Sequence, residues 1–291
     1  MSQSPPSEGD PEWSGERVER WLRQAEGVER QLAPVSDLLF AAAGLRPGER
    51  VLDVGCGRGP TTRHASRAVG AAGAVTGLDI STDMLDAARQ ATTPADGTIR
   101  WIAADVETWD PDDARFDVVL SRFGVMFFSD PPTAFRRLAG ATAPDGRLAI
   151  AIWARRDASE LFEVPLAAAM AALRTDGIDV EEPPAGGGPF SLGDRDVVTA
   201  LMTGAGWSDV AWQPHALSMT FGGGMSPAAA AGAALDIGPV RLVTAGIDDD
   251  EVRSRVRDAV ATALADHVDA SDQVVLGGEI IIVTARRQPP D

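Results

Sequence analysis

The sequence Val51-Leu52-Asp53-Val54-Gly55-Cys56-Gly57-Arg58-Gly59 decides the fold of this chain. A short apolar strand pattern runs into a turn that has glycine at alternate positions, and a helical pattern begins at Pro60. Glycine lets the backbone pass close to a bound ligand, where a Cβ atom would clash. The stretch therefore predicts a strand, a ligand-binding turn and a helix.

The spacing of the glycines separates this turn from the turn that binds dinucleotides. The dinucleotide fingerprint is Gly-x-Gly-x-x-Gly, whereas the third glycine here comes one residue earlier. Asp53 also places a carboxylate at the end of the strand, where it suits an ammonium group and would repel a pyrophosphate. The turn is therefore expected to receive the ammonium of an amino-acid moiety.

Strands and helices alternate along the middle of the chain. Strand patterns occur at 50–54, 74–79, 99–103, 116–120 and 147–153, with helical patterns between them at 60–69, 82–90 and 131–139. Such alternation predicts right-handed βαβ units and a parallel sheet covered on both faces. Further helices are expected at 161–174, 194–203 and 249–268, and further strands at 210–212 and 279–285. The expected fold is α/β, with a doubly wound, Rossmann-like sheet of seven mostly parallel strands.

The remaining segments predict a tail, a cap and two insertions. Residues 1–12 are polar and rich in proline, and they are expected to be disordered. Residues 13–44 carry two helical patterns and form an N-terminal helical cap. Residues 45–291 form the main domain, with insertions at about 155–190 and 220–272. Because segments inserted into a rigid sheet commonly carry specificity, these two are expected to act as lids over a substrate.

Charge and the rare residues exclude several classes of function. The chain has 26 Lys plus Arg, 43 Asp plus Glu and a net charge of −17. Nucleic acids and anionic membranes attract basic surfaces, so neither is an expected partner. The N-terminus lacks a signal-peptide pattern and no apolar run approaches the ~20 residues of a membrane span, so a cytoplasmic protein is expected. The single cysteine, Cys56, excludes an intrachain disulfide, and no metal-ligand spacing occurs, so no metal is expected.

The glycine-rich turn resembles motif I of the class I S-adenosylmethionine-dependent methyltransferases. The segment 75–81 is similar to their second strand, and Ala104-Asp105-Val106 is similar to the segment of their third strand. Residues 116–123 resemble the fourth strand and residues 138–152 the fifth, so the resemblance covers roughly 45–153. Within the class, the subgroup resembled is the one that includes the quinone-biosynthesis C-methyltransferases.

The resemblance implies S-adenosyl-L-methionine as the cofactor. In the matching motifs, the carboxylate at Asp79 accepts both ribose hydroxyls and the carboxylate at Asp105 meets the adenine amino group. The cofactor-binding residues that the resemblance implies are Asp53, Gly55, Cys56, Gly57, Arg58, Gly59, Asp79, Ile80, Met84, Asp105, Val106 and Ser121. The implied reaction transfers a methyl group to an oxygen, carbon or nitrogen atom of a small, apolar acceptor, of the kind found in secondary metabolism.

Methyl transfer sometimes needs a general base, and the composition narrows the candidates. Lysine and tyrosine are absent, which leaves the histidines and the carboxylates. His215, just past an expected strand, and His267, on the apolar stripe of the 249–268 helix, are the catalytic candidates. His64 is expected to pack or to lie at the surface.

The acceptor is expected to bind among apolar side chains. Trp21 in the cap, with Phe123 and Trp153 at the ends of strands, are the candidates, since ligands bind at the carboxyl ends of strands in such sheets. Two other functions remain open: a cofactor-dependent cyclisation or rearrangement without methyl transfer, and a non-catalytic cofactor-binding regulatory subunit. The oligomeric state also remains open, with a homodimer among the alternatives.

Overall fold

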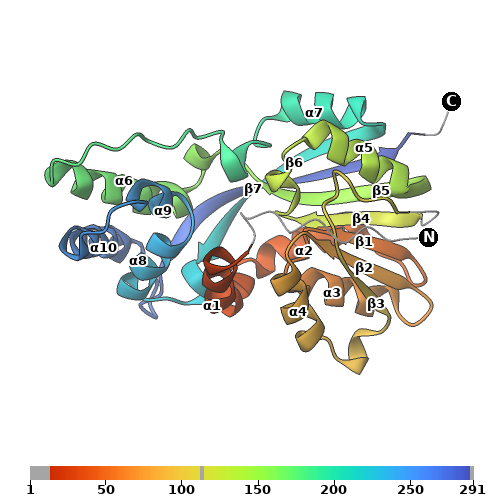
Figure 1. Cartoon of the computed structure of the whole chain (residues 1–291), viewed down its shortest axis with the longest axis horizontal. Coiled ribbons are helices and arrows are strands. Elements are labelled where there is room, and N and C mark those ends of the chain that lie inside the picture. The colour runs from red at the N-terminus through yellow and green to blue at the C-terminus, as the bar shows by residue number, and fades with distance from the viewer. Residues whose placement is uncertain (1–13, 112–114, 289–291) are drawn as a thin grey trace.

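The chain folds around one continuous sheet with helices on both faces. The computed structural model describes residues 14–111 and 115–288, so the tail expected at 1–12 lies outside the described residues. The 7-stranded sheet has the order β3-β2-β1-β4-β5-β7-β6 (Figure 1). Neighbours from β3 to β5 are parallel, and β7 is antiparallel to both β5 and β6. The doubly wound, mostly parallel α/β fold that the sequence predicts is confirmed.

The central strands are buried on both faces. The strands are β1 (Arg50–Val54), β2 (Ala74–Asp79), β3 (Ile99–Ala103), β4 (Phe116–Arg122), β5 (Thr142–Trp153), β6 (Trp207–Thr220) and β7 (Val275–Arg287). Val51, Leu52 and residues 118–120 are fully buried, as expected for parallel strands covered by helices on either side. The carboxyl ends of the parallel strands meet at one edge of the sheet, and this is where ligands bind in such folds.

Two layers of helices cover the sheet. One face carries α2 (Ala33–Ala43), α3 (Pro60–Val69) and α4 (Thr82–Ala91), and the other carries α5 (Pro131–Ala141) and α7 (Arg195–Gly204) (Figure 1). Local signals start these helices. Pro60 and Pro131 stand in the first turns of α3 and α5, and the side chains of Ser81 and Asp194 cap α4 and α7.

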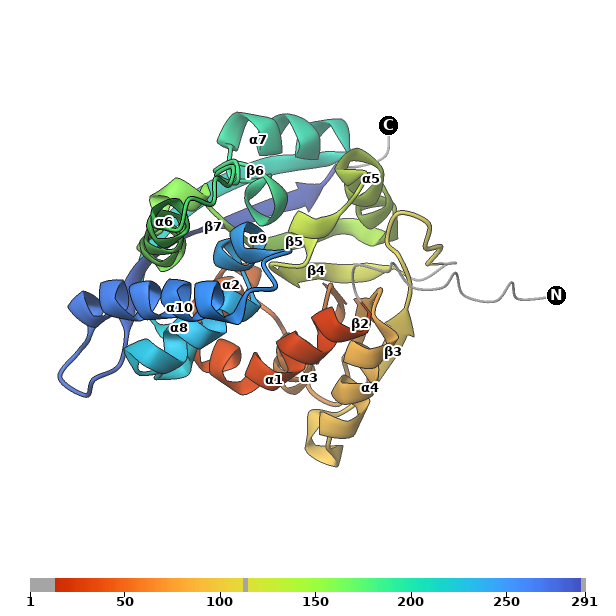
Figure 2. The same ribbon diagram turned by 60° about the vertical axis from the view of Figure 1, so that its left-hand side comes forward.

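A second group of helices lies beside the long β6–β7 pair, beyond the carboxyl ends of the central strands. It comprises α1 (Glu16–Gln31), α6 (Glu160–Thr175), α8 (Pro227–Asp236), α9 (Pro239–Thr244) and α10 (Asp250–Leu264). Figure 2 shows α8 and α10 side by side, with α1 crossing from there toward α4. The cap and the two insertions thus come together in space. None of the helices in the described ranges is both long enough and apolar enough to cross a membrane.

The structure corrects three expectations in the second half of the chain. The strand expected at 210–212 runs from Trp207 to Thr220, and Pro214 is tolerated inside it because β6 lies at the edge of the sheet. The helices α8 and α9 lie where the sequence predicts none, since α8 is mostly alanine and α9 has only 6 residues. The helix expected at 249–268 ends at Leu264, and a 3-10 turn, η7 (Ala265–His267), follows it.

Candidate cofactor and active site

The glycine-rich turn between β1 and α3 depends on its backbone conformation. Gly55, Gly57 and Gly59 have φ angles of 62°, 53° and 72°, a region that other residues enter at a cost of about 1–2 kcal/mol. The N–H groups of Gly55 and Cys56 donate to the carbonyl of Leu78, at 2.8 and 3.1 Å, and tie the turn to the end of β2. A Cβ atom built on Gly57 would meet no heavy atom within 4 Å, so there is open space beside this residue.

Asp79 lies at the end of β2 and contacts the turn. Its Oδ2 accepts a hydrogen bond from the N–H of Gly57 at 2.7 Å, and its Oδ1 accepts one from the N–H of Ser81 at 2.9 Å. Burial raises the pKa of Asp79, and these backbone donors offset part of the rise. Carboxylate oxygens have further lone pairs to offer. The carboxylate is therefore fixed beside Gly57 and can accept hydroxyl groups of a ligand.

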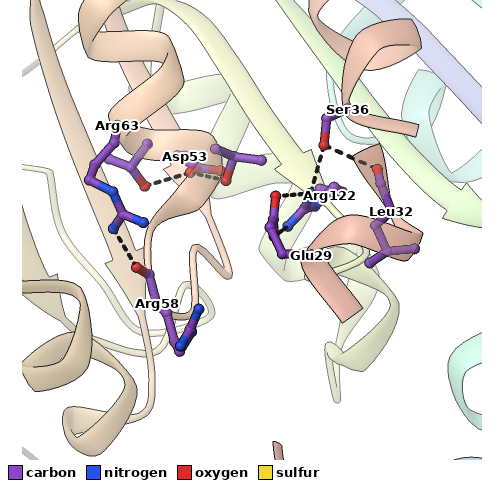
Figure 3. Close-up of polar contacts among 9 residues, drawn as sticks. Glu29, Leu32, Ser36, Asp53, Arg58, Arg63 and Arg122 are labelled. Carbon is purple, nitrogen blue, oxygen red and sulfur yellow. Dashed lines mark hydrogen bonds and ion pairs between the residues drawn. The ribbon is translucent and has the colours of Figure 1, made fainter. Parts of the chain in front are cut away.

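Asp53 is buried below the turn with half of its carboxylate unpaired. Its Oδ2 accepts hydrogen bonds from the hydroxyls of Thr61 and Thr62, both at 2.6 Å (Figure 3). Its Oδ1 is also buried and has no hydrogen-bond partner among the described residues. Burial raises the pKa of Asp53 to about 6, although the two threonines and the charge of Arg122 lower it. A buried acceptor without a donor is costly, which favours completion of the site by a ligand.

Trp101 on β3 supports the turn, although it is not among the residues predicted for the site. A Cβ atom built on Gly59 would lie 2.2 Å from the indole ring, and one built on Gly77 would lie 2.5 Å from it. The ring therefore occupies the space beside both glycines, and the third glycine of the turn serves close packing. Gly77 is the signal that could have found this contact, because glycine inside a strand marks the close approach of another group.

Two further residues of the predicted cofactor set make protein contacts at the same edge. Asp105 follows β3, and its Oδ1 accepts a hydrogen bond from the N–H of Glu107 at 2.8 Å. The buried hydroxyl of Ser121 donates to the carbonyl of Val54 at 2.7 Å and accepts from the N–H of Gly124 at 3.2 Å. Ser121 thus joins β4 to β1. The others differ in exposure: Cys56, Met84 and Val106 are buried, while Arg58 and Ile80 are half-buried.

Aromatic side chains gather at the carboxyl ends of β4 and β5. Phe123 has a φ of 64°, which is an outlier for a bulky residue and a form of strain that clusters at functional sites. Its ring stacks on Trp153, with 4.4 Å between centroids. Trp153 meets Phe162 edge-on at 4.9 Å, and Phe162 meets Phe190 at 5.0 Å. This aromatic row contains two of the three predicted substrate residues, while the third, Trp21, is half-buried on α1.

The two predicted bases lie on separate elements. His215 on β6 is opposite Ile280 of β7, and Ile280 is in turn opposite Trp153 of β5. Two strand spacings, or about 10 Å, therefore separate the backbone of His215 from the end of β5. His267 belongs to η7, in the connection between α10 and β7. A role for either imidazole in catalysis stays a prediction.

His64 has the packing role expected of it. Its ring stacks on that of Phe40 in α2, with 3.9 Å between centroids and 18° between planes. The pKa of His64 is lowered, first by burial and then by the charge of Arg67. The contact joins α2 to α3, so the imidazole stabilises the helical layer.

The geometry of this edge fits the cofactor that the sequence implies. S-adenosylmethionine carries an amino acid at one end and a nucleoside at the other. The unpaired Oδ1 of Asp53 suits its ammonium group, the oxygens of Asp79 suit its ribose hydroxyls, and the space beside Gly57 admits the ligand to the backbone. In the described part of the chain, no group of three or more His, Cys, Asp or Glu side chains is arranged to hold a metal ion.

Parts of the chain are similar to known proteins. A family model described as a methyltransferase domain matches residues 51–146. Aklanonic acid methyltransferase DauC from Streptomyces sp. is 39% identical over 103 residues, which are 35% of this chain and 47% of that protein. The ubiquinone/menaquinone biosynthesis C-methyltransferase UbiE from Idiomarina loihiensis is 34% identical over 124 residues, which are 42% of this chain and 49% of that protein.

A solved structure shares the fold along most of its length. The crystal structure of the YcgJ protein from a Bacillus species has a TM-score of 0.51 at 17% identity, over 88% of this chain and 98% of that chain. The chain spans about half the length of the curated relatives that it matches. The residues that the family model matches, 51–146, contain the turn, Asp79, Asp105 and Ser121. Over these residues the chain is similar to S-adenosylmethionine-dependent methyltransferases, and the relatives that it matches include quinone-biosynthesis enzymes.

Proposed function

We propose that this protein transfers the methyl group of S-adenosyl-L-methionine to an oxygen, carbon or nitrogen atom of a small, apolar acceptor. The observation that carries the proposal is the buried carboxylate of Asp53, whose Oδ1 lacks a partner among the described residues. An ammonium group would supply that partner, and hydrogen bonds between charged groups are worth about 1.5–3 kcal/mol. A dinucleotide would bring a pyrophosphate toward the turn, and the carboxylate would repel it.

The proposed binding mode uses the edge of the sheet from β1 to β3. Asp53 holds the ammonium group, the backbone at Gly57 lies against the ligand, and Asp79 accepts the ribose hydroxyls. Asp105 and Val106 receive the adenine. The bound cofactor supplies an electrophilic methyl group on a sulfonium. Because the displacement is in line, the task of the chain is to orient the acceptor and to exclude water.

The aromatic row supports a flat, apolar acceptor. Phe123 and Trp153 lie where the methyl donor and the acceptor would meet, at the ends of β4 and β5, and Trp21 would add to this wall from α1. The matched relatives are named for small organic acceptors, which supports an acceptor from secondary metabolism. The net charge of −17 favours such a molecule over a nucleic acid, and the proposal includes action in the cytoplasm.

Calorimetry tests the cofactor. S-adenosylhomocysteine should bind and NAD should not. Asp79→Ala should weaken the binding of S-adenosylhomocysteine by about 1.5–3 kcal/mol, because the ribose loses a charged acceptor. Asp83→Ala, which removes an exposed carboxylate from the next helix, is the matched control and should bind normally. A preference for NAD would refute the proposal.

Mass spectrometry of turnover mixtures then separates the reaction types. A panel of quinones and phenolic acids with S-adenosylmethionine should give a product heavier by one CH₂ group, together with S-adenosylhomocysteine. An isomer of the acceptor, without consumption of the cofactor, would establish a rearrangement instead. Binding of the cofactor with no product from any acceptor would favour a regulatory subunit.

A further inference from the structure

The side chain of Arg122, at the carboxyl end of β4, is paired with groups from two helices. Its Nη1 and Nη2 donate to the two carboxylate oxygens of Glu29 in α1, at 2.9 and 2.5 Å (Figure 3). Its Nη1 also donates to the hydroxyl of Ser36 in α2, at 2.6 Å. The side chain of Arg122 is 9% exposed and that of Glu29 is 37% exposed. Arg122 is therefore a fixed part of this edge, and Glu29 is its more exposed partner.

Arg122 lies close enough to Asp53 to act on its charge. The two residues belong to the neighbouring strands β4 and β1, and the charge of Arg122 lowers the pKa of Asp53. An amino acid carries its ammonium and its carboxylate on the same carbon atom. A ligand that places its ammonium on Asp53 therefore needs a cation nearby for its carboxylate. Arg63, on the α3 side of the turn, donates instead to the carbonyl of Arg58 at 2.7 Å.

We propose that Arg122 binds the carboxylate at the amino-acid end of the cofactor, and that Glu29 takes its place in the free protein. This inference rests on the proposed function. A guanidinium pairs with any carboxylate through the same two parallel hydrogen bonds, so the side chain of Glu29 and an amino acid can replace each other. Binding of the cofactor is then an exchange, in which the ligand carboxylate takes the guanidinium and Glu29 turns to the solvent.

The exchange has a measurable cost. Without a partner, a guanidinium as buried as that of Arg122 would be unfavourable, so Glu29 stabilises the free protein. The same contact competes with the cofactor and lowers its apparent affinity. Removal of the competing charge should therefore strengthen the binding of a ligand that has a carboxylate, and should leave unchanged the binding of a ligand that has none.

Comparison of two nucleosides isolates the contribution of the amino-acid end to binding. S-adenosylhomocysteine has the amino-acid end, and 5′-methylthioadenosine lacks it. Calorimetry on the full chain should show that Glu29→Gln binds S-adenosylhomocysteine about threefold tighter or more, the worth of a partly exposed ion pair. Arg122→Gln should bind it about tenfold weaker or more. Arg122→Lys should fall between, because lysine keeps the charge and loses the paired geometry.

The controls distinguish this exchange from structural support. All three variants should bind 5′-methylthioadenosine as the wild type does. Glu26→Gln, which removes an exposed charge one turn earlier on α1, should change neither affinity. Equal weakening of both nucleosides by Glu29→Gln would show that Glu29 only supports the fold. Equal effects of Arg122→Gln on both would place the carboxylate elsewhere. Failure of both nucleosides to bind the wild type would overturn the proposed function itself.

Discussion

The buried carboxylate of Asp53, when ionised, would attract the ammonium group of the ligand and destabilises the folded protein. Burial raises its pKa from the usual 3.8 to about 6, so the folded protein binds the proton more tightly than the unfolded chain does. Its contribution to stability is therefore greatest below the unfolded pKa and is lost as the pH rises through about 6. At neutral pH the ionised carboxylate costs the fold about 3 kcal/mol, at 1.36 kcal/mol per pKa unit, until a cation pairs with it.

The raised pKa of Asp53 predicts that cofactor binding depends on pH. The affinity for S-adenosylhomocysteine should fall as the pH is lowered through about 6, because the protonated Asp53 no longer attracts the ammonium. The affinity for 5′-methylthioadenosine, which has no ammonium, should stay constant. Asp53→Asn should raise the melting temperature of the free protein near neutral pH, by an amount that vanishes near pH ~4, and should remove the pH dependence of binding. A wild-type affinity that does not change across this range would contradict the assignment.

Gly57 tests whether the ligand approaches the backbone of the turn. A valine there would fill the open space beside the residue, so Gly57→Val should abolish cofactor binding while the far-UV circular dichroism stays native-like. Gly70, at the end of α3, offers a matched control, because its φ is 67° and a Cβ built on it also meets nothing within 4 Å. Gly70→Val should carry similar strain and keep binding. Survival of binding in Gly57→Val would show that the ligand lies elsewhere.

At the scale of elements, the packing of β2, β3 and α3 depends on glycines beneath the ring of Trp101. A Cβ built on Gly77 would lie 2.5 Å from this ring and 3.1 Å from the sulfur of Cys56. Gly77→Ala should therefore destabilise the protein by about 1–3 kcal/mol, the usual cost of overpacking. Trp101→Leu should lower this cost when the two changes are combined, since the clash is removed. Urea denaturation of the four variants measures the coupling, and strictly additive effects would show that the ring is not the obstacle.

The same scale shows what the sequence can predict and what it cannot. The elements from β1 to β5 follow the local periodicity of apolar residues and the local helix-start signals. The sequence therefore predicts the turn and the place of Asp79 at the end of β2. The length of β6 depends on pairing with β7, whose partner residues lie more than 50 positions farther along the chain. No local hydrophobic periodicity within β6 indicates this length. The pairing of Arg122 with Glu29 joins residues 93 positions apart, and that of Ser121 with Val54 joins residues 67 apart. Contacts of this kind exist only once the sheet is assembled.

At the scale of the whole molecule, the cap and the second insertion are joined. A Cβ built on Gly27 of α1 would lie 2.4 Å from the carbonyl oxygen of Gly222, so the two backbones touch. The N–H of Gly222 also donates to the side chain of Gln31 at 2.7 Å, and Arg30 donates to the carbonyl of Gly223 at 3.1 Å. Any movement of α1 should therefore carry the second insertion with it.

The first insertion has its own anchor. Arg156 is buried and pairs with Glu163 of α6 at 2.7 Å and with Glu182 at 2.8 Å. This ion-pair cluster holds the loop at 182–189 against α6. The insertions are therefore packed helical units, and closure over an acceptor would be a movement of whole helices.

Hydrogen exchange decides whether these units act as lids. Opening of a core strand requires global unfolding, whereas a lid can open alone at a lower free energy. In the free protein, 155–190 and 220–272 should exchange faster than the strands at 50–54 and 116–120. They should gain protection with S-adenosylhomocysteine, and more when an acceptor found in the turnover screen is added. Gly27→Ala should loosen 16–31 and 220–272 together and leave the strands unchanged. If the insertions are as protected as the strands in the free protein, they are permanently packed and do not act as lids. The acceptor would then reach its site without any movement of these helices.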